Sequence, residues 1–279
     1  MATEETGGGM STASMAQQSL RDGDPGLALQ QLQEQVRAAP ADARLRLFLF
    51  QLLAVRGDWE RAQAQLAVAS TLDASALAMM PMYREAIGCE CLRARVFEGR
   101  AAPLTFGPPA PWMALLIESL LTARCAPAQA EQLRARAFEQ AMPVSGTLDG
   151  QAFGWIADAD SRLGPVLEAF IEGHYYWVPF AQLRAIAIDA PHDLRDVVWM
   201  PARFVFADGG EAAGLIPTRY PGSEAAADPL LALSRKTAWR QAAPGLWHGL
   251  GQRIIATDGG ESALMDVRRI VIDAPEGPG

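Results

Sequence analysis

The chain has 279 residues, of which 50% are hydrophobic and 20% charged, a composition typical of a packed globular protein with one large or two ordinary domains. Its 24 basic residues are outnumbered by 32 acidic ones, and no stretch gathers the basic side chains that nucleic-acid phosphates require. No apolar run reaches the roughly 18 residues of a membrane span, and the N-terminus lacks the pattern of a secretory signal, so we expect a cytoplasmic protein that binds neither nucleic acid nor membrane.

The two ends of the chain are small and polar, which predicts disorder for residues 1–14 and 274–279. Between them the pattern changes after Pro143. We therefore expect a helical domain over residues 15–142 and a β-rich domain over residues 143–273.

A repeat with an offset of 34 residues marks the beginning of the helical part. Its two copies share Gly-Asp, then Ala, then Leu: Gly23-Asp24, Ala28 and Leu32, and again Gly57-Asp58, Ala62 and Leu66. Each aspartate can cap the free N–H groups of a helix, and Pro25 suits a first helical position. This spacing is the tetratricopeptide period, so it predicts stacked helical hairpins with a concave face that holds a peptide or helix.

Further helices follow from apolar periodicity. They are predicted at residues 42–56, 76–98, 112–123 and 128–141, with Pro81 limiting or kinking the first turn of the second. Another helix is predicted over residues 155–172, at the start of the β-rich domain, with a break at Gly164-Pro165.

The rest of the second part carries short β-branched and aromatic runs between turn residues. Strands are predicted at residues 175–180, 183–188, 197–199, 203–207, 215–217, 246–248, 253–257, 264–267 and 270–272. These runs indicate an antiparallel sandwich or small barrel, and with the helical part they give an α+β fold class.

Two glycine-rich segments are candidates for a ligand-binding loop. Residues 203–220 align with residues 253–270 through a shared Asp-Gly-Gly-Glu, which is typical of a tight hairpin turn. A phosphate-binding loop would need a strand that leads into a helix, whereas here strand leads into strand. Gly249-Leu-Gly251 lacks a third glycine and is predicted to be a turn.

The residues that bind metals or perform catalysis do not occur in known spacings. Cys89, Cys91 and Cys125 and the three histidines, His174, His192 and His248, are scattered, so we expect no metal site and no disulfide framework. Nucleophile-elbow and phosphate-loop motifs are absent from the sequence as well.

One acidic cluster carries an alternative hypothesis. Asp158, Asp160 and Arg162 lie close in sequence, with His174 twelve residues further on. On the predicted helix, carboxylates two positions apart point to different faces, which disfavours a shared acid/base site. Ion pairing is the favoured interpretation, and a hydrolase using Asp158, Asp160 and His174 is the alternative. Structural ion pairs are also expected at Asp193, Arg195, Asp196 and Arg219-Tyr220.

Several long segments resemble the ImpE family, also called the SciE-type or TagJ proteins. They are RLFLFQLLAVRGDWERAQAQL at 46–66, MYREAIGCECLRARVFEG at 82–99, DGQAFGWIADADSRLGPVLEAFIEGHYYWVPF at 149–180, HDLRDVVWMPARF at 192–204, IPTRYPGSE at 216–224, RKTAW at 235–239 and GLGQRIIATDGGE at 249–261. The resemblance implies a cytoplasmic, non-catalytic accessory protein of the bacterial type VI secretion system that uses no cofactor. It also implies an adaptor that binds an N-terminal helix of the small sheath subunit and connects the sheath to its AAA+ disassembly ATPase.

The resemblance transfers no residue-level binding motif, so the partner groove is predicted from residue types. The first choice is the domain junction, near Trp155, Asp160, Arg162, Tyr176 and Trp177, because it gathers aromatic side chains with charges. The second choice is the concave face of the repeats, near Phe48, Gln51, Arg84 and Arg93. A third class of protein is a purely structural subunit of the secretion system. Its stoichiometry in the assembly would distinguish it from an adaptor.

Overall fold

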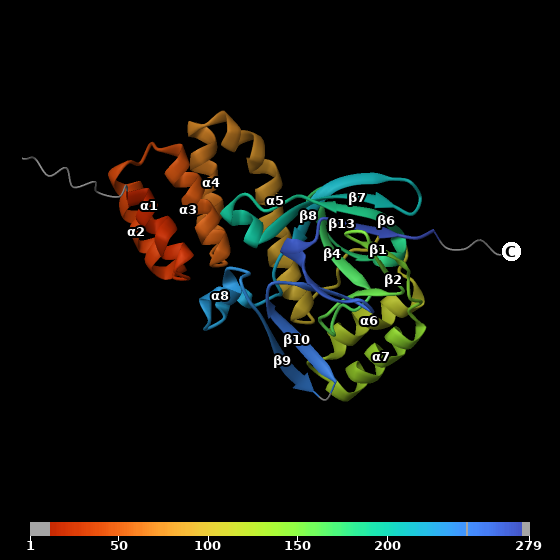
Figure 1. Ribbon diagram of the computed structural model, residues 1–279. Helices are drawn as coiled ribbons and strands as arrows, with labels where there is room; N and C mark the ends of the chain where they lie inside the picture. Colours follow the sequence, from red (N-terminus) through yellow and green to blue (C-terminus); the bar gives the residue numbers. More distant parts are fainter. Residues whose placement is uncertain (1–11, 244, 275–279) are drawn as a thin grey trace, which may run out of the picture. The chain divides into compact units, whose positions relative to one another are not determined.

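The computed structural model describes residues 12–243 and 245–274 (Figure 1). By its internal contacts the chain divides into two compact units, one ending at Met80 and one beginning at Pro81. Most of the two ends predicted to be disordered, residues 1–11 and 275–279, lies outside the described residues. Residues 12–14 were expected to be disordered too, but they belong to the first helix.

The first unit consists of helices that pack as hairpins, α1 on α2 and α3 on α4. Their bounds are α1 (Thr12–Arg21), α2 (Pro25–Ala38), α3 (Ala43–Val55), α4 (Trp59–Leu72) and the beginning of α5 (Ala74–Phe97). The repeated alanines and leucines at 28, 32, 62 and 66 are all 0% exposed, as close packing between helices requires. The predicted tetratricopeptide-like region is confirmed.

The aspartates before these helices do not all act as caps. Asp24 accepts a hydrogen bond from the Leu27 N–H at 2.8 Å, and Asp42 accepts from Arg44 and Leu45 at 2.8 and 3.2 Å. The predicted cap at Asp58 is wrong, because its side chain turns to Arg61 at 2.9 Å and makes no capping bond.

Helix α5 continues through Pro81, so this proline does not limit the helix start, and the other expected effect, a kink at this position, stays a prediction. Proline removes one N–H from the helix ladder at this point. The division between the two units falls at the same place, between Met80 and Pro81.

The second unit contains a hairpin of α6 (Pro111–Thr122) and α7 (Pro127–Gln140) and an antiparallel sheet whose strands run in the order β2-β1-β13-β6-β7-β8-β4-β5 (Figure 1). These strands are β1 (Gly146–Leu148), β2 (Gln151–Phe153), β4 (Val166–Ile171), β5 (His174–Pro179), β6 (Leu183–Ile188), β7 (Trp199–Phe206), β8 (Glu211–Pro217) and β13 (Arg269–Ile272). In the described chain the edge strands β2 and β5 do not pair with each other, so this sheet is not a closed barrel.

Two smaller sheets complete the unit. One contains β3 (Ile156–Asp158), β11 (Ile254–Thr257) and β12 (Gly260–Ala263), and the other contains β9 (Thr237–Ala243) and β10 (Leu246–Gly251). Ile156 and Ile255 of the three-stranded sheet belong to the apolar cluster on one face of the large sheet. The α+β class with an antiparallel β-rich C-terminal part is therefore confirmed.

The helix predicted over residues 155–172 is wrong, because the segment forms β3 and β4 instead. All six residues of β4 are buried, so both faces of the strand are covered and its sequence shows no alternation. Such a run cannot be told from a buried helix by periodicity alone.

Two other local predictions also need correction. Gly249 and Gly251 lie in β10 rather than in a turn, and the predicted strand at 264–267 is mostly a 3₁₀ turn, Leu264–Asp266. Strands β1, β2, β9 and β12 were not predicted at all. The two Asp-Gly-Gly-Glu segments do lie at hairpins, β7–β8 and β11–β12, as predicted.

The different behaviour of Asp42 and Asp58 gives a matched test of helix capping. We expect Asp42→Ala to lower the free energy of unfolding of the helical unit by about 1 kcal/mol, because two N–H groups of α3 lose their acceptor. Asp58→Ala should cost less than half of that, since only an exposed ion pair is lost. Urea unfolding followed by circular dichroism measures both. Equal losses would contradict the assignment of the caps.

Candidate functional site

A buried carboxylate, Glu168 of β4, lies between two arginines. Arg93 of α5 donates from Nε and Nη2 to its two carboxylate oxygens at 2.7 and 3.0 Å, and Arg253 donates to it from the opposite side. The Tyr175 hydroxyl of β5 adds a further hydrogen bond. All three charged side chains are at most 2% exposed.

Two opposing effects act on the pKa of Glu168. Burial alone raises it, because a carboxylate loses its hydration. Arg93 and Arg253 outweigh burial and lower the pKa to about 2. The carboxylate is therefore charged across the whole physiological range and serves as the counter-ion of both arginines.

On the helical side the hydrogen bonds continue from Arg93. Its guanidinium reaches Glu90 at 3.3 Å and the carbonyl of Arg219 at 2.8 Å. Glu90 in turn accepts from the indole N–H of Trp199 in β7 at 3.0 Å. Helix α5 is thereby tied to the large sheet by charged and polar contacts as well as by apolar packing.

On the opposite side the bonds continue from Arg253 to Asp158. Asp158 also accepts from the Tyr220 hydroxyl at 3.0 Å and from the backbone N–H of Asp160 at 2.8 Å. Burial raises the pKa of Asp158 to about 6, against the lowering by Arg253. Asp160 is paired with Arg162 and accepts from the Gly249 N–H at 2.8 Å.

These residues form one buried ion network, which we define as Glu90, Arg93, Asp158, Asp160, Arg162, Glu168 and Arg253. It joins α5, β3, β4 and the residue before β11, segments that are distant in sequence. The predicted ion pairing of Asp158, Asp160 and Arg162 is part of it, although the pairs lie on loops and strands and not on a helix. Tyr220 and Arg219 are also structural, since Arg219 donates to the Ala232 carbonyl at 2.7 Å.

The hydrolase hypothesis requires Asp158, Asp160 and His174 to converge. Asp158 and Asp160 are 3% and 0% exposed and are held in ion pairs. His174 is exposed at the start of β5, with Nδ1 2.7 Å from the carbonyl oxygen of Glu172. The structure does not place the histidine in the ion network.

The five residues predicted to bind a partner are not equally accessible. Trp155 is 42% exposed, whereas Asp160 and Trp177 are buried and cannot meet a partner while the fold persists. Trp177 instead donates to the Tyr175 hydroxyl at 2.6 Å. Arg162 lies over the Phe97 ring at 4.7 Å, and Tyr176 stacks on Phe106 at 4.3 Å.

Phe48 and Gln51, two of the four residues predicted for the second site, line an open hollow within the helical unit. It has a volume of about 360 Å³ and is lined by Gln17 of α1 and by Arg44, Leu45, Leu47, Phe48 and Gln51 of α3. The spacing of the α3 residues places them along one side of that helix. We call this hollow the α1–α3 groove. Arg93, which was predicted to line it, belongs to the buried ion network instead.

Three residues of the network were not identified from the sequence, namely Glu168, Arg253 and Glu90. A signal was present for the first, because a single carboxylate interrupts the apolar run Val166–Ile171. A buried strand tolerates such a group only with a charged partner, so Glu168 implied a distant basic residue. Nothing in the sequence identified Arg253 as that residue.

The described residues give little support for a metal site or a reactive thiol. They contain no group of three or more histidine, cysteine or acidic side chains placed to hold a metal ion. Burial raises the pKa of the Cys89 thiol to about 12, which keeps it protonated. None of the helices in this part of the chain combines the length and hydropathy of a membrane-spanning helix.

The fold and the network define a class of protein in which helical hairpins precede an antiparallel β-rich unit with a charged interior. Residues 150–271 match the model of the family described as ImpE protein. The chain is 48% identical over 261 residues to the type VI secretion system accessory component TagJ of Pseudomonas aeruginosa, covering 93% of this chain and 92% of that protein. The chain therefore belongs to the ImpE family, a family of type VI secretion accessory proteins.

A solved structure supports the same assignment at the level of the fold. The crystal structure of protein VPA1032 from Vibrio parahaemolyticus superposes with a TM-score of 0.84 at 26% sequence identity. The match covers 93% of this chain and 97% of that chain, so it includes both the helical and the β-rich parts.

The charge of Glu168 predicts how stability depends on pH. Its pKa in the fold lies below its ordinary value of 4.5, so the ionised carboxylate stabilises the fold fully above pH 4.5. This contribution is lost as the pH falls toward 2. At pH 7 we expect Glu168→Gln to cost about 3–5 kcal/mol, because two buried arginines lose the carboxylate that they share.

Urea unfolding followed by tryptophan fluorescence measures this difference at a series of pH values. The gap between wild type and Glu168→Gln should narrow between pH 4.5 and 2. Glu211→Gln, which alters an exposed carboxylate of the same sheet, should leave stability nearly unchanged. A gap that stays constant down to pH 2 would contradict the ionised state of Glu168.

Proposed function

We propose that this chain is a non-catalytic cytoplasmic adaptor of the type VI secretion system. It binds the N-terminal helix of the small sheath subunit and links the sheath to the AAA+ ATPase that disassembles it. Membership of the ImpE family and the accessory role named for the Pseudomonas relative support this proposal. The observation that carries it furthest is the open α1–α3 groove in the helical unit.

The chemistry of the α1–α3 groove suits an amphipathic helix. Leu45, Leu47 and Phe48 are half-buried and give the groove its apolar side chains. Arg44 and Gln17 are exposed, so they can pair with polar groups at the rim. An apolar floor with a polar rim is the arrangement by which helical peptides are held in grooves.

The surface around Trp155 remains the other proposed place for the helix. Only Trp155 among the five predicted residues combines a large apolar side chain with high exposure. The remaining four are buried, stacked or held in an ion pair. The geometry therefore favours the α1–α3 groove over the surface first predicted.

An enzyme is the competing class, and the side chains suggested for it argue against it. Asp158 has a raised pKa, a property that catalytic carboxylates share with buried structural ones. Asp158 is 3% exposed and Asp160 is 0% exposed, so neither carboxylate is accessible to a substrate. The adaptor reading needs only accessible surface, which the groove supplies.

Binding of a fluorescently labelled peptide that spans the N-terminal helix of the small sheath subunit tests the proposal. We expect Phe48→Glu to weaken binding at least tenfold, because it places a charge on the apolar floor of the groove. Leu72→Glu introduces the same charge at an exposed apolar position of α4 and should leave the affinity unchanged.

Trp155→Ala distinguishes the two proposed surfaces in the same assay. If only Trp155→Ala weakens binding, the helix docks on the β-rich unit and the groove assignment fails. If the wild-type protein does not bind the peptide at all, the sheath-adaptor proposal itself fails.

A further inference from the structure

The large sheet has two unlike faces. Residues at alternate positions of each strand point to one face, and Met200, Ala202 and Phe204 of β7 belong to the apolar cluster on the core side. Trp199 of β7 and Glu168 of β4 point to the other side, where they bond Glu90 and Arg93 of α5. Helix α5 therefore covers the outer face at one end of the sheet.

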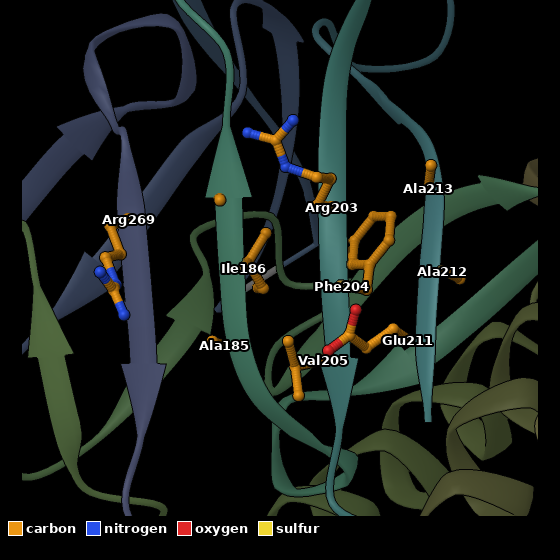
Figure 2. Close-up of a pocket in the computed structure, with 10 residues that line it drawn as sticks. Ala185, Ile186, Arg203, Phe204, Val205, Glu211, Ala212, Ala213 and Arg269 are labelled. Carbon is orange, nitrogen blue, oxygen red and sulfur yellow. The ribbon is translucent and has the colours of Figure 1, made fainter. Parts of the chain in front are cut away.

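Beyond α5 the outer face is open to solvent. Arg203, Glu211, Ala213 and Arg269 on this part of the sheet are exposed, and they border a hollow of about 510 Å³ (Figure 2). The strand register places its outward side chains in two cross-strand rows. These are Arg269–Ala187–Arg203–Ala213 and Val271–Ala185–Val205–Glu211.

The middle of this surface is a trough along β6. The two outward side chains of β6 are Ala185 and Ala187, while the neighbouring strands β13 and β7 carry Arg269 and Arg203 beside Ala187 (Figure 2). Strands β13 and β7 lie on either side of β6, so they are separated by two strand spacings, or about 9.5 Å. An α-helix with its side chains is about 10 Å wide, so the trough has the width of one helix.

The composition of this trough is unusual for a sheet face in water. The side chains that an antiparallel sheet turns to solvent are normally polar, whereas five of the eight outward residues in these two rows are alanine or valine. The same outer face already holds a helix elsewhere, and Ala213 borders both this hollow and the one beside Glu85 and Cys89 of α5. The trough therefore extends a surface on which this chain itself packs a helix.

The charges at the two sides of the trough are positive. Arg203 is 70% exposed and contacts only the exposed Asp189, at 3.5 Å, a pair of little strength. Among the described residues no carboxylate forms an ion pair with Arg269. Glu211 is the acidic residue of the two rows, and it stands at the far strand, β8.

We propose that this trough on β6 is a docking site for an amphipathic helix of a partner protein. The helix would lay short apolar side chains on Ala185 and Ala187 and carry acidic residues on both flanks, opposite Arg203 and Arg269. A second copy of the same face fits less well, because a two-fold contact would bring the arginine rows of both copies together. The proposal goes beyond the sheath-binding function, since it uses a different surface in the other unit.

Two designed helical peptides of roughly 20 residues, long enough to remain helical, test the proposal. Both carry alanine and leucine on one face, one with glutamates on both flanks and the other with lysines. Fluorescence anisotropy with the full-length protein should show binding of the glutamate peptide and at least tenfold weaker binding of the lysine peptide. The double variant Arg203→Glu with Arg269→Glu should reverse this preference.

Two further variants separate a specific trough from general charge attraction. Ala187→Leu fills the trough and should weaken binding of the glutamate peptide at least fivefold. Arg100→Glu, at an exposed site outside the trough, should leave this binding unchanged. Phe48→Glu should leave this binding intact, so failure of the sheath assay and failure of this one are distinguishable.

Three results would overturn the proposal. The first is that the wild-type protein does not bind the glutamate peptide, and the second is that the double arginine variant leaves the affinity unchanged. The third is that sedimentation experiments show dimerisation through this face. Circular dichroism confirms that each variant is folded before its affinity is compared.

Discussion

The β-rich unit depends on the placement of one carboxylate, Glu168, between Arg93 and Arg253. A buried carboxylate without a cation would lose its hydration without compensation. Without Glu168, each arginine would keep only one carboxylate partner, Glu90 for Arg93 and Asp158 for Arg253. The three side chains come from α5, from β4 and from the residue before β11, so they can be satisfied only when those segments meet. This pairing requirement specifies one arrangement of helix α5 and the large sheet. Apolar packing makes a larger but less specific contribution to the stability of that arrangement.

This constraint also decides which side chains remain for function. Asp158, Asp160, Arg162 and Trp177 are the residues that looked functional in sequence, yet they belong to the network or pack against it. The accessible surface of the described residues includes the α1–α3 groove in the helical unit and the open outer face beyond α5. A chain of this kind is suited to holding other proteins, which agrees with the accessory role of its Pseudomonas relative.

The helical unit was predictable because its signals are local. Gly-Asp turns, a capping aspartate and the apolar stripe of α3 each act within a few residues, and the repeat made the pattern visible twice. Strands 183–188 and 270–272 were predicted almost to the residue for the same reason. The β4 segment was not, because burial on both faces erased its period of two. The candidate site was predicted only in part, since Phe48 and Gln51 do line the α1–α3 groove but Arg93, Asp160 and Trp177 are buried. The hydrogen bonds of Arg93 and Asp160 reach residues up to 126 positions away in the sequence, and no local pattern reports such contacts.

We propose that the helical unit holds a partner helix in the α1–α3 groove. Hydrogen–deuterium exchange of the full-length chain, with and without the N-terminal helix of the small sheath subunit, tests it most directly. The account predicts slower exchange in α1 and in residues 44–51 of α3 when the peptide is bound, with α4 unchanged. Protection confined to the segment around Trp155, or no protection anywhere at saturating peptide, would contradict it.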